Sequence, residues 1–444
     1  MEYSRERYVE KLTERMGDGL VKVITGTKMA GKSYLMNELF YRRLLDSGVR
    51  TDEIIRFAFD SDDDIDLLEA YFPEDSTRIR QRNGQFLVNS KKFRAYIRDK
   101  ADGKERMFIM LDEVQLLEDF VGTVNSLNRH QNYDIYVTGS NSKFLSTDIA
   151  TEFRGRGSVI HVLPLAFSEY IRGSSDKIDE LWRDYIETGG IPVVAKMRSR
   201  EERMDYLRIL CEETYLKDII SRNGIRNPDS LSDVFNILAS TVGSPVNPNR
   251  IANTFRTVLG QDITADTVSN YMRYFEEAFV LSRAMKYDVK GRKYIGSPFK
   301  IYFEDVGIRN VRLNFRQMEE SHLMENIIYN ELRYRGFNVD VGSVDINERT
   351  DRIDSNGRSI YAKKCLEVDY IATFGNRKLY IQSALSMSDP EKALQEKRPL
   401  NSIDDSFTKI VITKDNLNPY RDEKGVIIMG LFDFLVDEHS LDRL

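Results

Sequence analysis

The segment VKVITGTKMAGKSYLMNELF, residues 21–40, constrains the fold of this chain more than any other. A β-branched run from Val21 to Ile24 enters a glycine-bounded loop, and apolar residues at helix spacing follow the loop. From Gly26 to Ser33 the loop has the spacing G-x-x-x-x-G-K-S. This order of strand, loop and helix predicts an α/β fold, in which a parallel sheet flanked by helices carries a phosphate-binding loop (P-loop).

Each residue type in the loop suits a triphosphate. Glycines let backbone N–H groups curl around phosphate oxygens at a helix N-terminus, which already favours anions. Lys32 can bring a positive charge to the β- and γ-phosphates, and the Ser33 hydroxyl can bind Mg²⁺. The residues predicted to bind the cofactor are Gly26, Thr27, Lys28, Met29, Ala30, Gly31, Lys32, Ser33 and Tyr34.

A second apolar run, from Met107 to Leu111, is typical of a buried strand and ends in two acids. Acidic residues at the carboxyl end of such a strand face the crevice where α/β folds bind ligands. We expect Asp112 to hold Mg²⁺ together with Ser33, and Glu113 to orient or polarise an attacking water. The acid pair therefore predicts hydrolysis of the nucleotide as well as binding.

Two more predicted strands end in polar residues at the same edge of the sheet. EIIRFAFD ends at Asp60, and YDIYVTGSN ends at Ser140 and Asn141. Asn141 is a candidate catalytic residue that contacts the γ-phosphate or the water, and a capped strand-to-helix turn is the competing interpretation. Further on, Arg156 is a stronger candidate than Arg154 for stabilising transition-state charge, although loop arginines are more often simply solvated.

Composition excludes several other classes of protein. Charged residues make up 31% and hydrophobic residues 41% of the chain, a balance typical of soluble globular proteins. No apolar run approaches the ~18 residues needed to cross a bilayer, so we expect no membrane segment and a cytoplasmic location. Cys211, Cys365 and four scattered histidines lack the spacing of a disulfide framework or a zinc site. The net charge of −6 argues against charge-driven coating of nucleic acid.

Short motifs follow one another along the chain in a specific order: GTKMAGKS, FDSDD, IMLDEVQ, VTGSNSKFL, FRGRG, LPLAFSEY and YIETGGIPVV. This order resembles that of the bacterial AAA+-like P-loop ATPases that carry a C-terminal domain of unknown function. Later blocks, such as YLKDII and EVDYIATFGNRKLYIQSA, extend the resemblance over nearly the whole chain.

The resemblance implies that the nucleotide is ATP. It gives the loop, Asp112 and Glu113 the roles described above, and it makes Arg156 an arginine sensor, acting either in its own subunit or on a neighbour in an oligomer. Many members of the family have two arginines in the middle of the loop, where this chain has Lys28 followed by Met29. One basic residue is therefore missing from the loop.

Residues 201–310 are predicted to form a helical and winged-helix domain. Three helices are predicted within 228–243, 247–260 and 264–280, each opened by a capping residue or proline, and a hairpin-like run follows at 281–305. In a winged helix, the third helix can enter a DNA major groove. Acids on that helix, such as Glu276 and Glu277, would repel phosphates, so DNA binding and a protein-contact or structural role both stay open.

Residues 311–444 are spaced like a PD-(D/E)XK nuclease, in which clustered carboxylates and a lysine assemble Mg²⁺ and water. Glu325, on a predicted helix, and Asp369, on a predicted strand with Glu367 nearby, fit the pattern. Gln382 stands where an acid is expected, and Ala384 stands where the lysine is expected. We therefore predict a restriction-endonuclease-like α/β module whose site is degenerate, kept as a binding surface, and an ordinary α/β module is the alternative.

These predictions give three domains, at 1–200, 201–310 and 311–444. The leading hypothesis is a Mg²⁺-dependent ATPase that acts as a nucleotide-driven switch, with C-terminal modules that recognise a protein or nucleic-acid partner. Two alternatives stay open: an ATP-regulated nucleic-acid-binding protein or nuclease, and a binding module with a structural nucleotide that is not hydrolysed.

Overall fold

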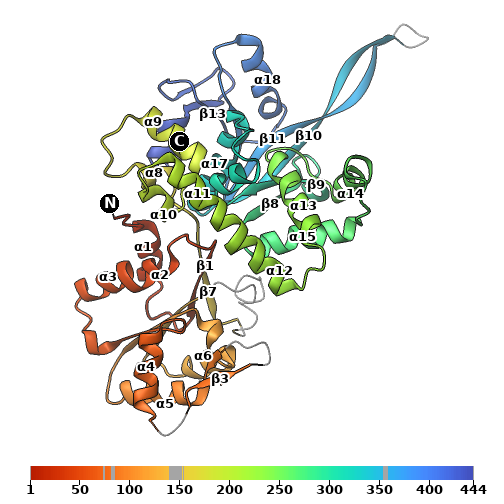
Figure 1. The fold of residues 1–444 in the computed structure, drawn as a ribbon. Helices are drawn as coiled ribbons and strands as arrows, with labels where there is room; N and C mark the ends of the chain where they lie inside the picture. The colour runs from red at the N-terminus through yellow and green to blue at the C-terminus, as the bar shows by residue number, and fades with distance from the viewer. Residues whose placement is uncertain are drawn as a thin grey trace. The chain divides into compact units, whose positions relative to one another are not determined.

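The computed structural model of the chain describes residues 2–73, 76–81, 86–139, 153, 155–353 and 359–443 (Figure 1). The chain divides into two compact units. Unit 1 comprises Met1–Pro164 together with Glu277–Phe279, and unit 2 comprises Leu165–Glu276 and Val280–Leu444. Of the helices in the described residues, none has both the length and the apolar character that crossing a membrane requires.

Unit 1 is built on a five-stranded parallel sheet, which confirms the predicted fold class. In sheet order its strands are β2 (Ile54–Ala58), β5 (Met107–Asp112), β6 (Tyr133–Thr138), β1 (Val21–Gly26) and β7 (Gly157–Val162). The residues of β1 and β5 are buried throughout, as expected of strands covered on both faces, and β1 includes the buried polar residues Lys22 and Thr25. Because all neighbouring pairs are parallel, the carboxyl ends of the strands meet at one edge of the sheet.

Helices and turns flank this sheet. They are α1 (Glu6–Glu14), α2 (Lys32–Tyr34), the π-helical η1 (Leu35–Phe40), α3 (Tyr41–Asp46), η2 (Thr51–Glu53), α4 (Asp62–Tyr71), α5 (Ser90–Lys100), η3 (Val114–Leu116) and α6 (Phe120–Leu127). A small hairpin pairs β3 (Arg78–Arg80) with β4 (Phe86–Val88). Part of the core beside the sheet is aromatic: the ring of Phe93 lies 5.0 Å from those of Phe57 and Phe59.

The helices of unit 2 occupy its first half and the flanks of a second sheet. They are α8 (Phe167–Ile171), α9 (Ile178–Thr188), α10 (Pro192–Lys196), α11 (Arg200–Ile209), η5 (Leu210–Leu216), α12 (Lys217–Asn223), α13 (Pro228–Ser240), α14 (Pro248–Thr254), η6 (Phe255–Leu259), α15 (Ala265–Glu277), α16 (Val306–Arg312), α17 (Glu320–Tyr334), α18 (Pro390–Asn401) and α19 (Leu431–Val436).

The second sheet is mixed and eight-stranded. In order its strands are β14 (Tyr420–Arg421), β15 (Ile427–Gly430), β13 (Thr408–Thr413), β12 (Arg377–Ala384), β11 (Ser359–Phe374), β10 (Asn338–Ile353), β8 (Leu281–Asp288) and β9 (Lys293–Phe303). β10 and β11 are long antiparallel partners, and in Figure 1 they extend away from the rest of unit 2 as a two-stranded ribbon.

The three helices and the hairpin predicted between 228 and 305 are present as α13, α14 with η6, α15, and β8 with β9. Stacked rings join them, because Phe235 lies 4.4 Å from Phe275 and 5.7 Å from Phe303 between centroids. However, β8 also pairs with β10, so the hairpin forms the edge of the large sheet. The sheet crosses the predicted boundary at 310, and the division into three domains stays a prediction.

In the interior of unit 2, the Thr188-Gly-Gly segment packs closely against Asp305. The Asp305 carboxylate accepts hydrogen bonds from the backbone N–H groups of Gly190 (2.7 Å) and Gly307 (2.9 Å). Gly189 has φ 74°, and a Cβ there would lie 2.1 Å from Asp305 Oδ1. Burial raises the pKa of Asp305 to about 6 in spite of these donors.

Candidate nucleotide site

The predicted phosphate-binding loop lies at the carboxyl end of β1. It begins at Gly26, which has φ 139° and lies so close to β7 that a Cβ would be 2.1 Å from the Val162 carbonyl oxygen. It ends at Gly31, with φ 90°, directly before α2. The Lys32 side chain is buried and turns back over the loop, where its Nζ donates to the carbonyl oxygens of Gly26 and Thr27, both at 3.0 Å.

The remaining predicted loop residues differ in what they contact. The Thr27 hydroxyl donates to the Phe279 carbonyl oxygen at 2.6 Å, and Ala30 is buried. Lys28 is half-buried, whereas Met29 and Ser33 are exposed. The Tyr34 hydroxyl donates to the Glu2 carboxylate.

Asp112 is buried at the end of β5, and both of its carboxylate oxygens accept hydrogen bonds. Oδ2 accepts from Asn37 Nδ2 at 3.1 Å. Oδ1 accepts from the Thr138 hydroxyl and, at 3.1 Å, from the backbone N–H of Glu113. These donors fix the orientation of the carboxylate.

The Asn37 bond brings the loop and the acid strand together. Asn37 lies on η1, which continues α2, four residues after Ser33. Because Asn37 contacts Asp112, the Asp112 carboxylate lies beside the helical segment that begins with Lys32 and Ser33. The two predicted Mg²⁺ ligands are thus on neighbouring elements.

β6 lies between the loop strand and the acid strand in the sheet. Its last residue, Thr138, pairs with Ile24 of β1 and donates its hydroxyl to Asp112 of β5. Thr138 therefore links the two strands across the intervening one. Neither Thr138 nor Asn37 is among the residues that the motifs predicted for the site, although both are polar residues at the ends or faces of predicted elements.

Glu113 is held in an uncommon conformation beside Asp112. Its backbone has φ 51°, a left-handed value that costs a non-glycine residue about 1–2 kcal/mol. Its carboxylate accepts a hydrogen bond from Gln115 Nε2. Partial burial raises the pKa of Asp60, at the end of β2, and the charges of Glu113 and Asp112 act in the same direction. Three acids thus gather at this edge.

These residues fit a Mg²⁺–triphosphate ligand by the chemistry of their donors. Lys32 and the N-terminus of α2 suit phosphate oxygens, while the Ser33 hydroxyl and the Asp112 carboxylate suit Mg²⁺. Mg²⁺ commonly binds one or two protein carboxylates together with the phosphates of the substrate, so the single carboxylate of Asp112 is sufficient to hold it.

The other predicted catalytic residues are not brought together in this way. Asn141, Ser140 and Arg154 lie outside the described residues. Arg156 is exposed and precedes β7, where its carbonyl oxygen accepts from the Val21 N–H at the start of β1. It is therefore separated from the loop of its own chain by the length of β1, about 17 Å at ~3.3 Å per residue. An action of Arg156 on the phosphates of its own chain is not supported.

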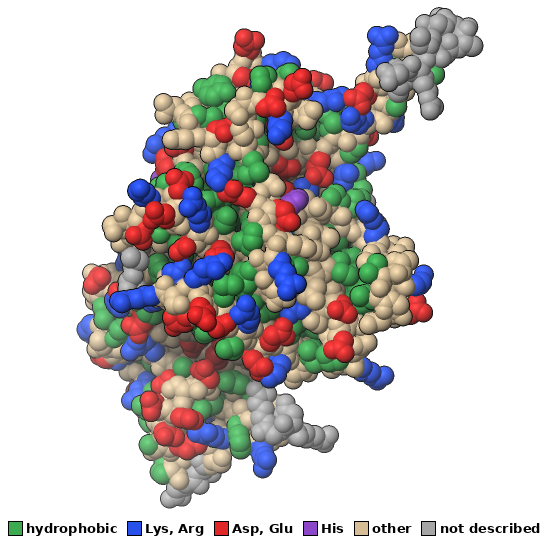
Figure 2. All heavy atoms as spheres, turned by 45° about the horizontal axis from the view of Figure 1, so that its top comes forward, with side chains coloured by type: hydrophobic (Ala, Val, Ile, Leu, Met, Phe, Trp, Pro, Cys, Tyr) green, Lys and Arg blue, Asp and Glu red, His purple; other side chains and the backbone are tan. Residues whose placement is uncertain are grey.

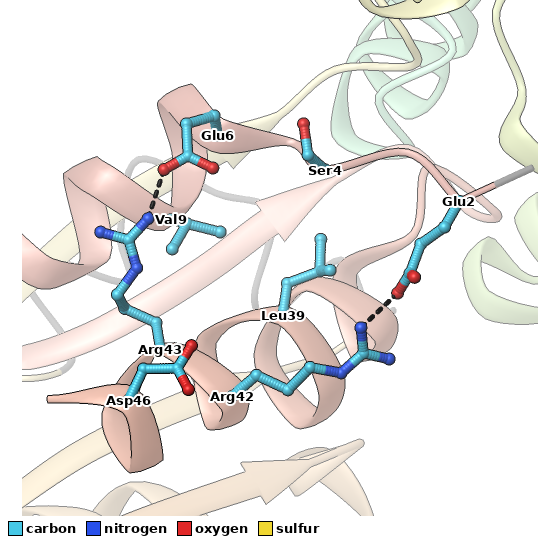
Figure 3. Close-up of a pocket in the computed structure, with 8 residues that line it drawn as sticks. All are labelled: Glu2, Ser4, Glu6, Val9, Leu39, Arg42, Arg43 and Asp46. Carbon is cyan, nitrogen blue, oxygen red and sulfur yellow. Dashed lines mark hydrogen bonds and ion pairs between the residues drawn. The ribbon is translucent and has the colours of Figure 1, made fainter. Parts of the chain in front are cut away.

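A separate hollow of about 300 Å³ lies between the N-terminal segment and the helix that follows the loop (Figure 3). It is lined by Glu2, Ser4, Glu6, Val9, Leu39, Arg42, Arg43 and Asp46. Arg42 pairs with Glu2 at 2.6 Å, and Arg43 pairs with Glu6. The hollow contains no residue predicted to bind the nucleotide, and its ion pairs fasten Glu2 and Glu6 to α3.

In unit 2, the residues predicted for the degenerate nuclease site do cluster. Glu325 on α17 and Glu367 and Asp369 on β11 all lie near one ammonium group, that of Lys300 on β9. Gln382 and Ala384 are buried on β12. Ala384 brings no lysine, as expected, but the structure supplies one from a strand that the sequence analysis assigned to another domain.

A P-loop at the carboxyl edge of a parallel sheet, facing an acid pair on a second strand, defines a class: the P-loop NTPases. Residues 18–171 match the family described as AAA domain, which contains this whole site. Unit 1 is accordingly an ATP-binding domain of the AAA ATPase class. Residues 179–319 match a second family, described as a domain of unknown function (DUF8612).

The chain belongs to the same family as an uncharacterized protein of Haemophilus influenzae. The two are 30% identical over 417 residues, which cover 92% of this chain and 93% of the relative. An uncharacterized protein of Methanocaldococcus jannaschii is 25% identical over 331 residues, covering 71% of this chain and 69% of that protein. The Haemophilus influenzae relative thus matches nearly the whole chain.

Similar solved structures include the ORC2 protein of Aeropyrum pernix with ADPNP and ADP, at a TM-score of 0.36 and 11% identity, covering 63% of this chain and 86% of that one. The ORC1 protein of Aeropyrum pernix in complex with DNA has a TM-score of 0.29 and 12% identity, covering 71% and 93%. At these TM-scores we draw no conclusion about function from the likeness.

Proposed function

We propose that the chain is a Mg²⁺-dependent ATPase that works as a nucleotide-driven switch. The observation that carries the proposal is the Asn37–Asp112 hydrogen bond, which sets the acid of β5 opposite the helix that begins with Lys32 and Ser33. A loop that only bound phosphate would need no such acid. A hydrolytic site needs it, together with a second carboxylate that can orient water.

Each residue has a separate task in this proposal. Lys32 exchanges its two carbonyl partners for phosphate oxygens, so the loop changes its internal hydrogen bonds when the nucleotide binds. Ser33 and Asp112 hold the Mg²⁺, which would neutralise charge developing on the phosphates. Glu113 exchanges its Gln115 contact for a water molecule and aligns that water for attack.

The AAA domain supports ATP as the nucleotide, and unit 2 supplies the recognition of a partner in this proposal. Its surface does not suggest a partner that is attracted by charge alone. On the face shown in Figure 2, lysine and arginine side chains are interspersed with acidic ones across the described residues, which agrees with the net charge of −6. Specific contacts, rather than a field of one sign, would select the partner.

Phosphate release from ATP tests the proposal directly. The wild type should release phosphate only with Mg²⁺, Glu113→Gln should bind ATP but turn over about 10²–10³-fold more slowly, and Lys32→Ala should lose binding. Glu105→Gln is a matched control, because Glu105 is exposed and lies just before the opposite end of β5. Tight ATP binding without turnover in the wild type would favour a structural nucleotide, and no binding would refute the proposal.

A further inference from the structure

A buried lysine lies among the carboxylates of the predicted nuclease-like site in unit 2. The Lys300 side chain is only 4% exposed. Its Nζ lies 2.8 Å from Glu325 Oε1, 2.6 Å from Glu367 Oε1 and 3.8 Å from Asp369 Oδ1. A single ammonium group therefore contacts carboxylates that arrive from both α17 and β11.

The fold holds Lys300 firmly in this position. Lys300 pairs with Ala284 of β8, directly before the register shift in the β8–β9 pairing that falls between Ala284 and Lys286. Two residues later, the Tyr302 hydroxyl donates to Glu325 Oε1 at 2.7 Å, and the Tyr302 ring stacks on Tyr329 of α17 at 4.1 Å. β9 is thus fixed against the helix that supplies Glu325.

The neighbouring residues on β12 suit this arrangement. Asp369 Oδ2 accepts from the Ser383 N–H at 2.9 Å, so its second oxygen is already engaged. The Gln382 side-chain oxygen accepts a hydrogen bond from the Asp369 N–H at 3.4 Å. Burial raises the pKa of Glu396 on α18 and the Gln382 amide acts in the opposite direction, so an acid at position 382 would place a like charge near Glu396.

Charge at the site favours a permanent cation. Burial alone disfavours the charged form of Lys300, but the carboxylates of Glu325, Asp369 and Glu367 outweigh it and raise the lysine pKa. The Lys300 ammonium, which lies 2.8 Å from Glu325 and 2.6 Å from Glu367, is the group that offsets the negative charge of the cluster.

We propose that the ammonium of Lys300 is the resident cation of this carboxylate cluster and occupies the place that a divalent metal ion would need. Among the described residues, no group of three or more His, Cys, Asp or Glu side chains is arranged to hold a metal ion, and this includes Glu325, Glu367 and Asp369 as they stand around Lys300. Metal entry would require the buried lysine to leave its hydrogen bond to Glu325 and its ion pair with Glu367. The cluster is a latent metal site, closed by a lysine from another strand.

The chemistry of an ammonium group differs from that of a metal. It donates hydrogen bonds and carries a single charge, but it does not act as a Lewis acid or lower the pKa of a bound water as metal ions do. The cluster then stabilises unit 2 and shapes its surface without activating water for attack on a phosphodiester. This inference does not depend on ATP hydrolysis by unit 1.

Binding of Mn²⁺ to the full-length chain, followed by electron paramagnetic resonance without nucleotide, tests the inference. The wild type should bind no Mn²⁺ at this cluster, so Glu367→Gln should leave the Mn²⁺-binding curve unchanged. Lys300→Met should gain one bound ion, and adding Glu367→Gln to Lys300→Met should weaken that ion by about 10-fold or more. Lys286→Met, on the neighbouring strand, is the control for the loss of one positive charge and should gain none.

Thermal unfolding gives a second measurement on the same proteins. Lys300→Met should melt below the wild type in EDTA, and Mn²⁺ at 100 times its Kd should raise its Tm by about 5 °C or more, with no such rise in the wild type. Mn²⁺ bound by the wild type and weakened by Glu367→Gln would overturn the inference, even if Lys300→Met failed to fold. A folded Lys300→Met that gains no ion would overturn it as well.

Discussion

Asn37→Ala is the substitution that most directly tests the site in unit 1. It removes the Nδ2 donor that lies 3.1 Å from Asp112 Oδ2. The other oxygen, Oδ1, keeps its hydrogen bonds from Thr138 and from the Glu113 N–H. In Asn37→Ala the Asp112 carboxylate therefore keeps the hydrogen bonds at Oδ1, but Oδ2 loses the donor that fixed its position. The sequence of the phosphate-binding loop is unchanged.

The expected size of the effect follows from the type of bond. A hydrogen bond to a charged group contributes about 1.5–3 kcal/mol. Asn37 is half-buried, so we take a value of about 2 kcal/mol, which corresponds to a decrease of about 30-fold in the rate of phosphate release. Because Asn37 acts through a Mg²⁺ ligand, the Mg²⁺ concentration for half-maximal rate should rise, whereas ATP binding in EDTA should not change.

The assay is steady-state phosphate release at several Mg²⁺ concentrations, with ATP binding in EDTA measured separately. Asn128→Ala is the control, because Asn128 donates to the Gly19 carbonyl oxygen at 3.2 Å in the same unit, away from the acid pair. A rate for Asn37→Ala within about twofold of that control, in an active wild type, would refute the positioning role. Equal losses of Mg²⁺-free binding and of rate would point to a damaged loop instead.

Three further predictions concern stability and reactivity. The pKa of Asp305 rises from 3.8 to about 6 on folding, so between these pH values the native state binds a proton that the unfolded state does not. The free energy of unfolding should therefore fall as pH rises from 4 to 7. Urea unfolding should show a fall of about 3 kcal/mol in the wild type beyond any fall in Asp305→Asn. Gly26→Ala should destabilise unit 1 by about 2 kcal/mol or more, because its Cβ would meet the β7 backbone at 2.1 Å, and unchanged thermal unfolding would contradict this. Iodoacetamide should modify exposed Cys365 in the native chain and spare Cys211, whose pKa burial raises to about 12, as peptide mass spectrometry would reveal.

The fold of unit 1 was largely predictable because its signals are local. Continuous apolar runs such as Met107–Leu111 are buried on both faces, and the G-x-x-x-x-G-K-S spacing marks the turn from β1 into α2. The order of the strands in the sheet was not predictable in the same way, since the residues of one strand do not determine which strand pairs with it. The insertion of β6 between β1 and β5, and hence the linking position of Thr138, depends on packing between distant segments.

Arg156 shows the limit of reading a site from the order of motifs. Its position in the chain, after the predicted strand that ends at Ser140 and Asn141, suggested a place near the phosphates. In a parallel sheet, however, a residue that precedes a strand lies at the opposite edge from one that follows a strand. Arg156 precedes β7, whereas the loop, Asp112 and Asp60 all follow their strands. If Arg156 acts on a phosphate at all, that phosphate must belong to another copy of the chain.

Lys300 was unpredictable for a deeper physical reason. A motif search compares spacings along one segment, and by that measure Ala384 leaves the carboxylates without a lysine. A cluster of largely buried carboxylates requires a positive charge nearby in space, and any part of the chain can supply that charge. Lys300, which lies 25 residues before Glu325 in the chain, supplies that charge. It is held beside Glu325 by the β8–β9 hairpin, with its register shift, and by the stacking of Tyr302 on Tyr329. An apparent loss in the motif is therefore accompanied by a gain elsewhere, and the gain changes the chemistry because the new cation is fixed to the chain.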